Sequence, residues 1–297
     1  MTHPVRIEND VLRLEVWPKL GGKVSSVVDK TDGFELLFNF PAEIPEDSMY
    51  GRPYENTWYA GWDECFPAVG VGHYVGHPYD QIPIPDHGEV YAIPTTSVPV
   101  KDGITSVWHG LRFGYRLTRR LTLTSEGLRA AYSLTNLAPF EFRFVWAQHA
   151  LMSMDSPVEF ELPSGSPMRW SHSPGKDVQQ PFTWPRISDQ IDLSTSDRLP
   201  SNGGWKVFAL EPIRSAATIR YPKRGRKLQM RYQGAGLEAF WGLWINTGAW
   251  NHQRHFAMEP TTGRFDQLDR AVQDGSAGRV GPGASIEWQV DWIVGGL

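Results

Sequence analysis

Apolar and polar residues alternate with a period of two over long parts of this chain. The clearest stretch is 285–294, in which Ile, Trp, Val, Trp and Val are separated by Glu, Gln, Asp and Ile. The stretch 128–135 shows the same alternation. Because successive side chains of a β-strand point to opposite faces, each stretch predicts a strand with one buried and one solvent-facing side.

Turn-forming residues divide 110–153 into three predicted strands, which end at Leu123, Asn136 and Leu151. The three strands are expected to form a meander. Helical periodicity is nearly absent elsewhere, and the best candidate for a short helix is 265–273.

Long strands joined by short turns predict an all-β fold, a large antiparallel β-sandwich or barrel with few short helices. No low-complexity linker separates two halves, so we predict a single domain over residues 1–297. Three Pro-rich stretches, 41–53, 78–99 and 181–200, are expected to be long loops that wall a cleft.

The composition narrows the class of protein. The 297 residues carry a formal net charge of −4, which argues against a nucleic-acid-binding protein, since those usually have a basic excess. The single cysteine, Cys65, excludes an intrachain disulfide and a zinc site built from several cysteines. The sequence has no signal-peptide pattern and no apolar stretch of membrane-spanning length. We therefore expect a cytoplasmic protein without membrane or nucleic-acid partners.

Three titratable residues stand out from apolar or turn-forming surroundings. His87 lies in a Pro-Asp-His-Gly loop, His149 lies in an apolar predicted strand, and Glu259 ends a strand just before Pro260. Two imidazoles and a carboxylate are the usual groups for moving protons near neutral pH. A titratable group on an apolar strand is costly unless it is paired or used.

Each of the three also has an ordinary structural explanation. A histidine on an apolar face is often a hydrogen-bonded core residue, a glutamate at a strand end is often a salt-bridge partner, and a loop histidine is often simply exposed. The pairs His73/His77 and His252/His255 have spacings that could serve a metal. No acidic residue or helix brings either pair together, so we predict no metal site.

Several segments occur in an order that points to one protein family. The segments 12–16 and 20–27 are similar to an opening strand, a Gly-Gly turn and a following strand. His87-Gly88 is similar to a His-Gly loop, His149 to a histidine at the end of a long central strand, and Glu259-Pro260 to a motif near the C-terminus. This ordered set, spread over most of the chain, resembles the aldose 1-epimerase (galactose mutarotase-like) superfamily.

The resemblance implies a galactose mutarotase-like β-supersandwich and a carbohydrate epimerase that interconverts the α and β anomers of an aldose. It implies that Glu259 is the general base on the C1 hydroxyl and His149 the general acid toward the ring oxygen. His87 would hydrogen-bond the ring oxygen or the C1 oxygen. Each positioned acid or base contributes about 10²–10⁴ in rate. The reaction implied needs neither a metal nor a redox cofactor.

Five further residues are candidates for binding the sugar. Arg52 stands in a Gly-Arg segment like one that the family has before its first histidine. Asp63 and Glu64 could hydrogen-bond sugar hydroxyls. Trp62 and Trp146 could stack on a sugar ring, because sugar-binding clefts favour broad aromatic faces. A core role is the alternative for any of the 13 Trp residues, and the identity and phosphorylation of the sugar stay open.

Two other functions also stay open. The chain could be a non-catalytic carbohydrate-binding protein of the same fold. It could also be a glycoside hydrolase or lyase; a hydrolase normally needs a second carboxylate opposite Glu259, which Asp63 or Glu64 would have to supply. In every case the expected partner is a small-molecule sugar, and the protein is expected to be a monomer or a homodimer.

Overall fold

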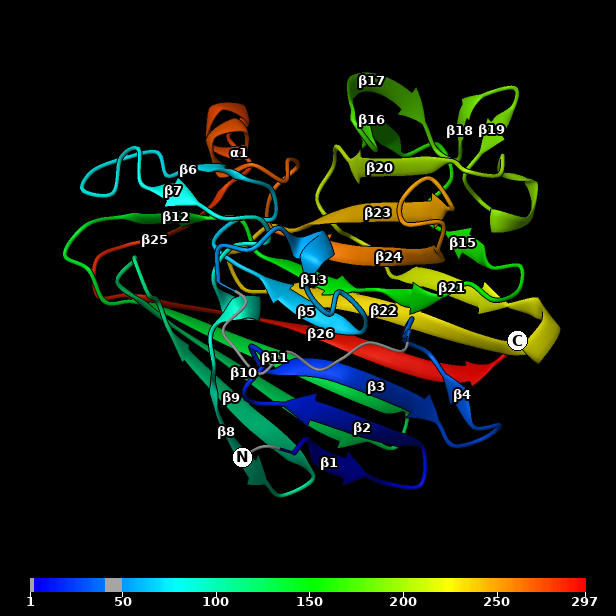
Figure 1. Ribbon diagram of the computed structural model, residues 1–297, viewed down its shortest axis with the longest axis horizontal. Helices are drawn as coiled ribbons and strands as arrows, with labels where there is room; N and C mark the ends of the chain where they lie inside the picture. Colours follow the sequence, from blue (N-terminus) through cyan, green and yellow to red (C-terminus); the bar gives the residue numbers. More distant parts are fainter. Residues whose placement is uncertain (1–2, 41–49) are drawn as a thin grey trace.

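The computed structural model describes residues 3–40 and 50–297. Within these residues the two largest sheets contain 14 and 8 strands, and neighbouring strands are antiparallel (Figure 1). The 14-stranded sheet runs in the order β1 (Val5–Glu8), β2 (Leu12–Trp17), β3 (Lys23–Asp29), β5 (Trp62–Cys65), β13 (Ala147–Ala150), β24 (Arg254–Thr261), β23 (Phe240–Thr247), β20 (Gly204–Ala209), β16 (Pro167–Ser173), β17 (Lys176–Thr183), β18 (Arg186–Ser188) and β19 (Ile191–Asp192), with β4 (Phe34–Glu35) paired to β3 and β14 (Met152–Ser153) paired to β24.

The 8-stranded sheet forms the second layer. Its order is β15 (Glu159–Glu161), β21 (Ala217–Tyr221), β22 (Arg226–Gly234), β26 (Ser285–Gly296), β11 (Gly127–Asn136), β10 (Tyr115–Thr124), β9 (Gly103–His109) and β8 (Thr96–Val100). Two small ribbons pair β12 (Phe142–Phe144) with β25 (Gly278–Val280) and β6 (Gly72–His73) with β7 (Pro83–Ile84). The short 3-10 turns are η1 (Tyr54–Asn56), η2 (Val90–Ala92), η3 (Ser196–Arg198) and η4 (Pro222–Arg224).

The core lies between the two large sheets, as the alternating patterns predict. In β26, Val290 and Trp292 are buried, and Trp292 stacks on Trp62 of the larger sheet with ring centroids 5.0 Å apart. Full burial of an aliphatic side chain such as Val290 contributes roughly 1.5–3 kcal/mol. The predicted all-β sandwich is thereby confirmed.

The middle strands of the larger sheet present different residues on their two faces. Glu64 of β5 and Gln148 of β13 point toward the 8-stranded sheet, where both contact the hydroxyl of Tyr132. Their neighbours Asp63 and His149, which oppose each other in register, lie on the outer face because side chains alternate along a strand. This outer face carries the candidate site.

The predicted third strand of the meander is not continuous. Residues 141–151 form β12, which pairs with β25, and then β13, which belongs to the larger sheet. The chain changes sheets at Val145 and Trp146, whose N–H groups donate to the Pro67 carbonyl and the Thr262 hydroxyl. The prediction of one continuous strand was wrong because the local alternation of apolar and polar residues does not show with which strand a segment will pair.

The helix expected over 265–273 appears as α1 (Leu268–Asp274), which ends at Gly275 in the left-handed conformation that suits a helix C-terminus. Across 3–40 and 50–297, none of the helices has the length and apolar character needed to cross a membrane.

The three Pro-rich stretches, all predicted to be long loops, differ in the structure. Residues 41–49 of the first lie outside the described residues. The second, 78–99, includes β7 and η2 and supplies the loop that carries His87. The third, 181–200, is not a plain loop, because it contains β18, β19 and η3.

Candidate active site

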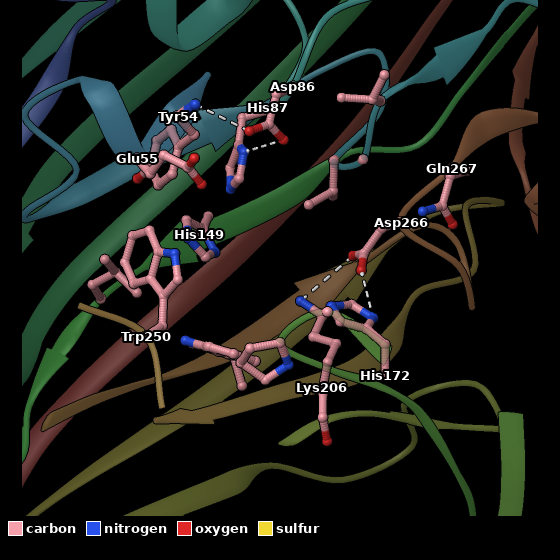
Figure 2. Close-up of a pocket in the computed structure, with 18 of the residues that line it drawn as sticks. Tyr54, Glu55, Asp86, His87, His149, His172, Lys206, Trp250, Asp266 and Gln267 are labelled. Atoms are coloured by element: carbon pink, nitrogen blue, oxygen red, sulfur yellow. Dashed lines mark hydrogen bonds and ion pairs between the residues drawn. The ribbon is translucent and has the colours of Figure 1, made fainter. Parts of the chain in front are cut away.

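A pocket of about 440 Å³ opens on the outer face of the larger sheet, a volume typical of small-molecule sites (Figure 2). Strands β13, β24, β23, β20 and β16 supply one part of its lining. The loops around η1, before β6, before η2 and before α1 supply further parts, together with the turns that follow β16 and β23. Its polar lining includes Asp86, His87, His149, His172, Lys206 and Asp266.

His149 and Glu259 are hydrogen-bonded to each other in neighbouring strands. His149 Nδ1 lies 2.6 Å from Glu259 Oε1. Glu259 is fully buried, whereas His149 is 7 % exposed and lines the pocket. The structure therefore brings the two residues together, and the imidazole is the member of the pair that lines the pocket.

The second oxygen of Glu259 is also occupied. Lys206 of β20 forms an ion pair with Glu259 Oε2, and its Nζ lies 3.5 Å from Asp266 Oδ1. Asp266 in turn faces His172 Nδ1 at 3.7 Å. Burial alone would raise the pKa of Glu259, but Lys206 and His149 outweigh it and lower the pKa to about 2. Glu259 is therefore a carboxylate at neutral pH.

His149 is neutral at pH 7. Burial is the largest influence on this imidazole and lowers its pKa, against the opposing effect of Glu259. An ionised carboxylate can only accept hydrogen bonds, which assigns the single ring proton to Nδ1 and leaves a lone pair on Nε2. The imidazole can thus accept a proton at Nε2 while Glu259 stabilises the imidazolium that forms.

The loop before η2 holds His87 next to His149, with ring centroids 5.0 Å apart. His87 Nδ1 lies 2.9 Å from Asp86 Oδ1, and the Tyr54 ring stacks on the imidazole at 3.7 Å. Burial would raise the pKa of Asp86, but His87 and the Tyr54 N–H lower it below the usual value. Asp86 is therefore an anion, and its hydrogen bond to Nδ1 holds the His87 ring in place.

The backbone of this loop is unusual. His87 and Gly88 both have left-handed φ angles, 59° and 75°. Residues other than glycine rarely adopt this backbone conformation, and where one does, the position is often functional. A Cβ at Gly88 would lie 2.2 Å from the Phe66 carbonyl oxygen, so only glycine lets the loop approach β5 this closely.

Aromatic residues form another part of the pocket lining. Trp244 and Trp250 line it together with His255, whose ring is fully buried. His255 Nε2 accepts from Trp244 Nε1 at 3.2 Å, which leaves the proton on Nδ1, where no hydrogen-bond partner is present among the described residues. A buried donor without a partner is costly.

Four of the five predicted sugar-binding residues are buried away from the pocket lining. Trp62, Glu64 and Trp146 pack toward the 8-stranded sheet, and both indole N–H groups donate to the Glu64 carboxylate. Asp63 lies on the outer face, but it binds Lys23 and accepts from the Tyr54 hydroxyl. Their burial and their hydrogen bonds inside the protein do not favour direct sugar contact, and for these four residues a sugar-binding role stays a prediction.

Arg52 is exposed, precedes η1 and does not line the pocket. The sugar contact that its sequence context suggests stays a prediction. Neither Asp63 nor Glu64, the two candidates for the second carboxylate of a hydrolase, lines the pocket.

Sequence reasoning missed several residues of the site. Lys206 lies in the otherwise apolar strand 204–209, and a lysine in such a strand is a signal for a buried ion pair. Asp86, Asp266 and His255 gave no comparable signal, because each becomes part of the site only through contacts with distant segments.

Comparisons with known proteins support the fold. No protein-family model and no curated protein sequence matches the chain. Among solved structures, the Slr1438 protein of Synechocystis has a TM-score of 0.75 at 16 % identity, with 100 % of this chain and 97 % of that chain covered. A galactose mutarotase-like protein of Lactobacillus casei has a TM-score of 0.72 at 15 % identity, with 98 % and 100 % covered. A galactose mutarotase related enzyme of Lactobacillus acidophilus has a TM-score of 0.69 at 13 % identity, with 97 % of each chain covered.

These structures are similar to this chain over its whole length, and identities this low show the fold alone. The chain has the galactose mutarotase-like fold, which confirms the predicted resemblance at that level.

Proposed function

We propose that this protein is a carbohydrate epimerase of the aldose 1-epimerase type, which interconverts the α and β anomers of an aldose. The observation that carries the proposal is the hydrogen-bonded His149–Glu259 pair in a pocket that also contains His87. An acid and a base next to each other are what ring opening and closure require. The fold alone does not carry the activity, since one fold hosts many functions.

The geometry supports a division of roles that differs from the one implied by the family resemblance. Glu259 is fully buried and both its oxygens are occupied, so His149 Nε2 is the better placed base for the C1 hydroxyl. Glu259 then stabilises the His149 imidazolium. His87, paired with Asp86, is the better placed acid for the ring oxygen.

The proposed reaction balances without a cofactor. His149 takes the proton of the C1 hydroxyl, the bond between C1 and the ring oxygen breaks, and a C1 carbonyl forms while His87 protonates the ring oxygen. Rotation about the C1–C2 bond presents the other face of the aldehyde. Closure of the ring runs the proton transfers in reverse, which returns both histidines to their starting states.

A neutral aldose suits the pocket better than a sugar phosphate. Among the described residues that line it, Lys206 is the only lysine or arginine, and its ammonium is already bound to two carboxylates. Phosphate recognition usually requires a free lysine or, preferably, a bidentate arginine. The Trp244 and Trp250 rings offer apolar surface to a sugar ring.

The experiment is an anomer-exchange screen. Freshly dissolved pure anomers of common aldoses and their 6-phosphates are followed by polarimetry or NMR with and without the protein. We expect at least one neutral aldose to equilibrate faster, and His149→Asn to lower that acceleration by about 10²–10⁴. His73→Asn is the matched control, because His73 is exposed on β6. Equal rates for the two variants would contradict the assignment of His149.

A non-catalytic carbohydrate-binding protein is the second candidate. The observation that favours it is the complete occupation of the Glu259 carboxylate by His149 and Lys206, which withholds that group from a sugar. This candidate predicts that no anomer equilibrates faster in the anomer-exchange screen. A thermal unfolding measurement with the same sugars should then show that one aldose raises the unfolding temperature.

A further inference from the structure

Three residues from separate segments bring possible metal ligands close together. Cys65, His87 and His149 each place one ligand atom within 4.8 Å of the others. Cys65 is fully buried and is the only cysteine of the chain. The sequence does not reveal this group, because His87 lies 22 positions after Cys65 and His149 lies 62 positions after His87, and no local motif joins them.

The sheet register explains why they meet. Cys65 lies two positions after Asp63 on β5, so both side chains lie on the outer face, where Asp63 opposes His149. The loop of His87 is fixed beside Cys65 by the bridge between Phe66 and Gly88. The close contact between Gly88 and Phe66, which only glycine permits, therefore also places His87 next to the Cys65 thiol.

Both histidines are oriented in the way that metal-binding histidines usually are. Each uses Nδ1 for a carboxylate: His87 for Asp86 at 2.9 Å and His149 for Glu259 at 2.6 Å. A carboxylate behind the ring fixes its orientation and raises its strength as a ligand, and leaves Nε2 for the metal. Two imidazoles bound to one ion at about 2.0–2.1 Å have ring centres roughly 5 Å apart, and these centroids are 5.0 Å apart.

We propose that Cys65, His87 and His149 bind one Zn²⁺ ion, with a fourth position open toward the pocket. Thiolate and imidazole are the ligands that zinc prefers, and three protein ligands with one open position form an ordinary zinc geometry. A Zn–S bond of about 2.3 Å requires the three side chains to close in slightly. The Cys65 thiolate and the carboxylates of Asp86 and Glu259, which hydrogen-bond the two histidines, supply negative charge that favours a divalent cation.

Zinc binding and proton transfer exclude each other in this site. The ion occupies Nε2 of both histidines, the atoms assigned to the base and the acid, so zinc is an inhibitor of the epimerase. This consequence rests on the proposed function, whereas the binding site itself does not. Without a metal, burial and the nearby carboxylates raise the pKa of the Cys65 thiol, so zinc binding displaces its proton.

The test is a metal titration of the full chain after removal of metals by dialysis against a chelator. Zn²⁺ is added in competition with a chromophoric chelator, and Co²⁺ serves as a spectroscopic substitute. We expect one equivalent per chain and a cobalt spectrum with tetrahedral bands and a sulfur-to-metal charge-transfer band. Cys65→Ser should remove the charge-transfer band and weaken zinc binding at least about 100-fold, and His73→Asn should change neither.

Asp86→Asn provides a second variant, should Cys65→Ser fail to fold. It keeps all three ligands but removes the carboxylate behind His87, and zinc affinity should fall about 10- to 100-fold. Zinc affinity weaker than millimolar, or a cobalt complex without the charge-transfer band, would overturn the proposal. So would wild-type zinc affinity in folded Cys65→Ser or in Asp86→Asn.

Inhibition is measured separately with an aldose that responds to the protein. Zinc should slow anomer exchange over the concentration range in which it binds, and a chelator should restore the rate. Anomer exchange that persists with zinc bound would contradict the inhibition. A chain that binds zinc but accelerates no aldose overturns only the proposed function, and one that accelerates an aldose but binds no zinc overturns only the metal site.

Discussion

Two buried glutamates on opposite faces of the larger sheet show how similar chemistry can serve different ends. Glu64 points toward the 8-stranded sheet, where it accepts from Arg119, Tyr132 and two indole N–H groups. Glu259 points outward and binds His149 and Lys206. Both are fully buried, and both have a cationic partner.

The two networks differ in what their members face. Every group around Glu64 is inside the core, and burial raises the pKa of Glu64 even though Arg119 opposes it. Around Glu259, His149 and Lys206 line the pocket, and the pKa of the carboxylate falls to about 2. A buried charge is therefore poor evidence for function by itself, and its neighbours' access to a cavity is the better guide.

The largest expected effect concerns the inner network. Arg119→Met leaves Glu64 without its cation, and breaking a buried pair in this way costs about 3–5 kcal/mol. We expect the free energy of unfolding in urea to fall by that amount, with an unchanged rate of anomer exchange per folded molecule below the unfolding transition. A large loss of rate at full folding would show that the inner network also serves the site.

The outer network is tested by Lys206→Met. Burial would lower the pKa of Lys206, but Asp266 and Glu259 raise it, so the ammonium is a fixed charge beside Glu259. Without it the Glu259 pKa rises, the carboxylate stabilises the His149 imidazolium less well, and we expect the exchange rate to fall about 100-fold. Lys223→Met, at an exposed position in η4, is the matched control and should keep the wild-type rate.

The alternation of side chains was enough to predict the sandwich and the strands around 128–135 and 285–294, because it follows directly from strand geometry. It also placed His149 on an apolar strand. It could not predict that Glu64 and His149 would lie on opposite faces, since that depends on register with β5 and β24. A lysine in the apolar strand 204–209 hints that Lys206 is paired, but its partners and the place of Asp266 in the site depend on contacts between distant strands and loops, which no local pattern records.

Gly88→Ala tests how the His87 loop is held against β5. The new Cβ would clash with the Phe66 carbonyl, and the alanine would be held in a left-handed backbone conformation. Such backbone strain costs roughly 1–3 kcal/mol. We expect the unfolding free energy to fall by that amount, and the exchange rate to fall because His87 is displaced. Gly33→Ala, at a left-handed turn where a Cβ meets nothing, isolates the cost of φ alone.

The pH dependence of stability reports on His255. Burial is the main cause that lowers its pKa to about 3, while the unfolded value lies near 6.5. Between these values the unfolded state binds the extra proton, so His255 makes stability fall as the pH drops from about 6.5 to about 3, by up to about 1.4 kcal/mol per pH unit. In urea titrations across that range, His255→Gln should show a shallower slope than wild type, and equal slopes would contradict the shift.

The most direct test of the His149–Glu259 assignment compares one substitution at the two glutamates. Glu259→Gln and Glu64→Gln keep size and remove one buried charge each. Anomer exchange of a responsive aldose is measured for both, with the folded fraction checked by circular dichroism. We predict that Glu259→Gln lowers the rate by about 10²–10⁴, whereas Glu64→Gln loses stability but keeps the wild-type rate per folded molecule. A wild-type rate in Glu259→Gln, or an equal loss in both variants, would contradict the assignment.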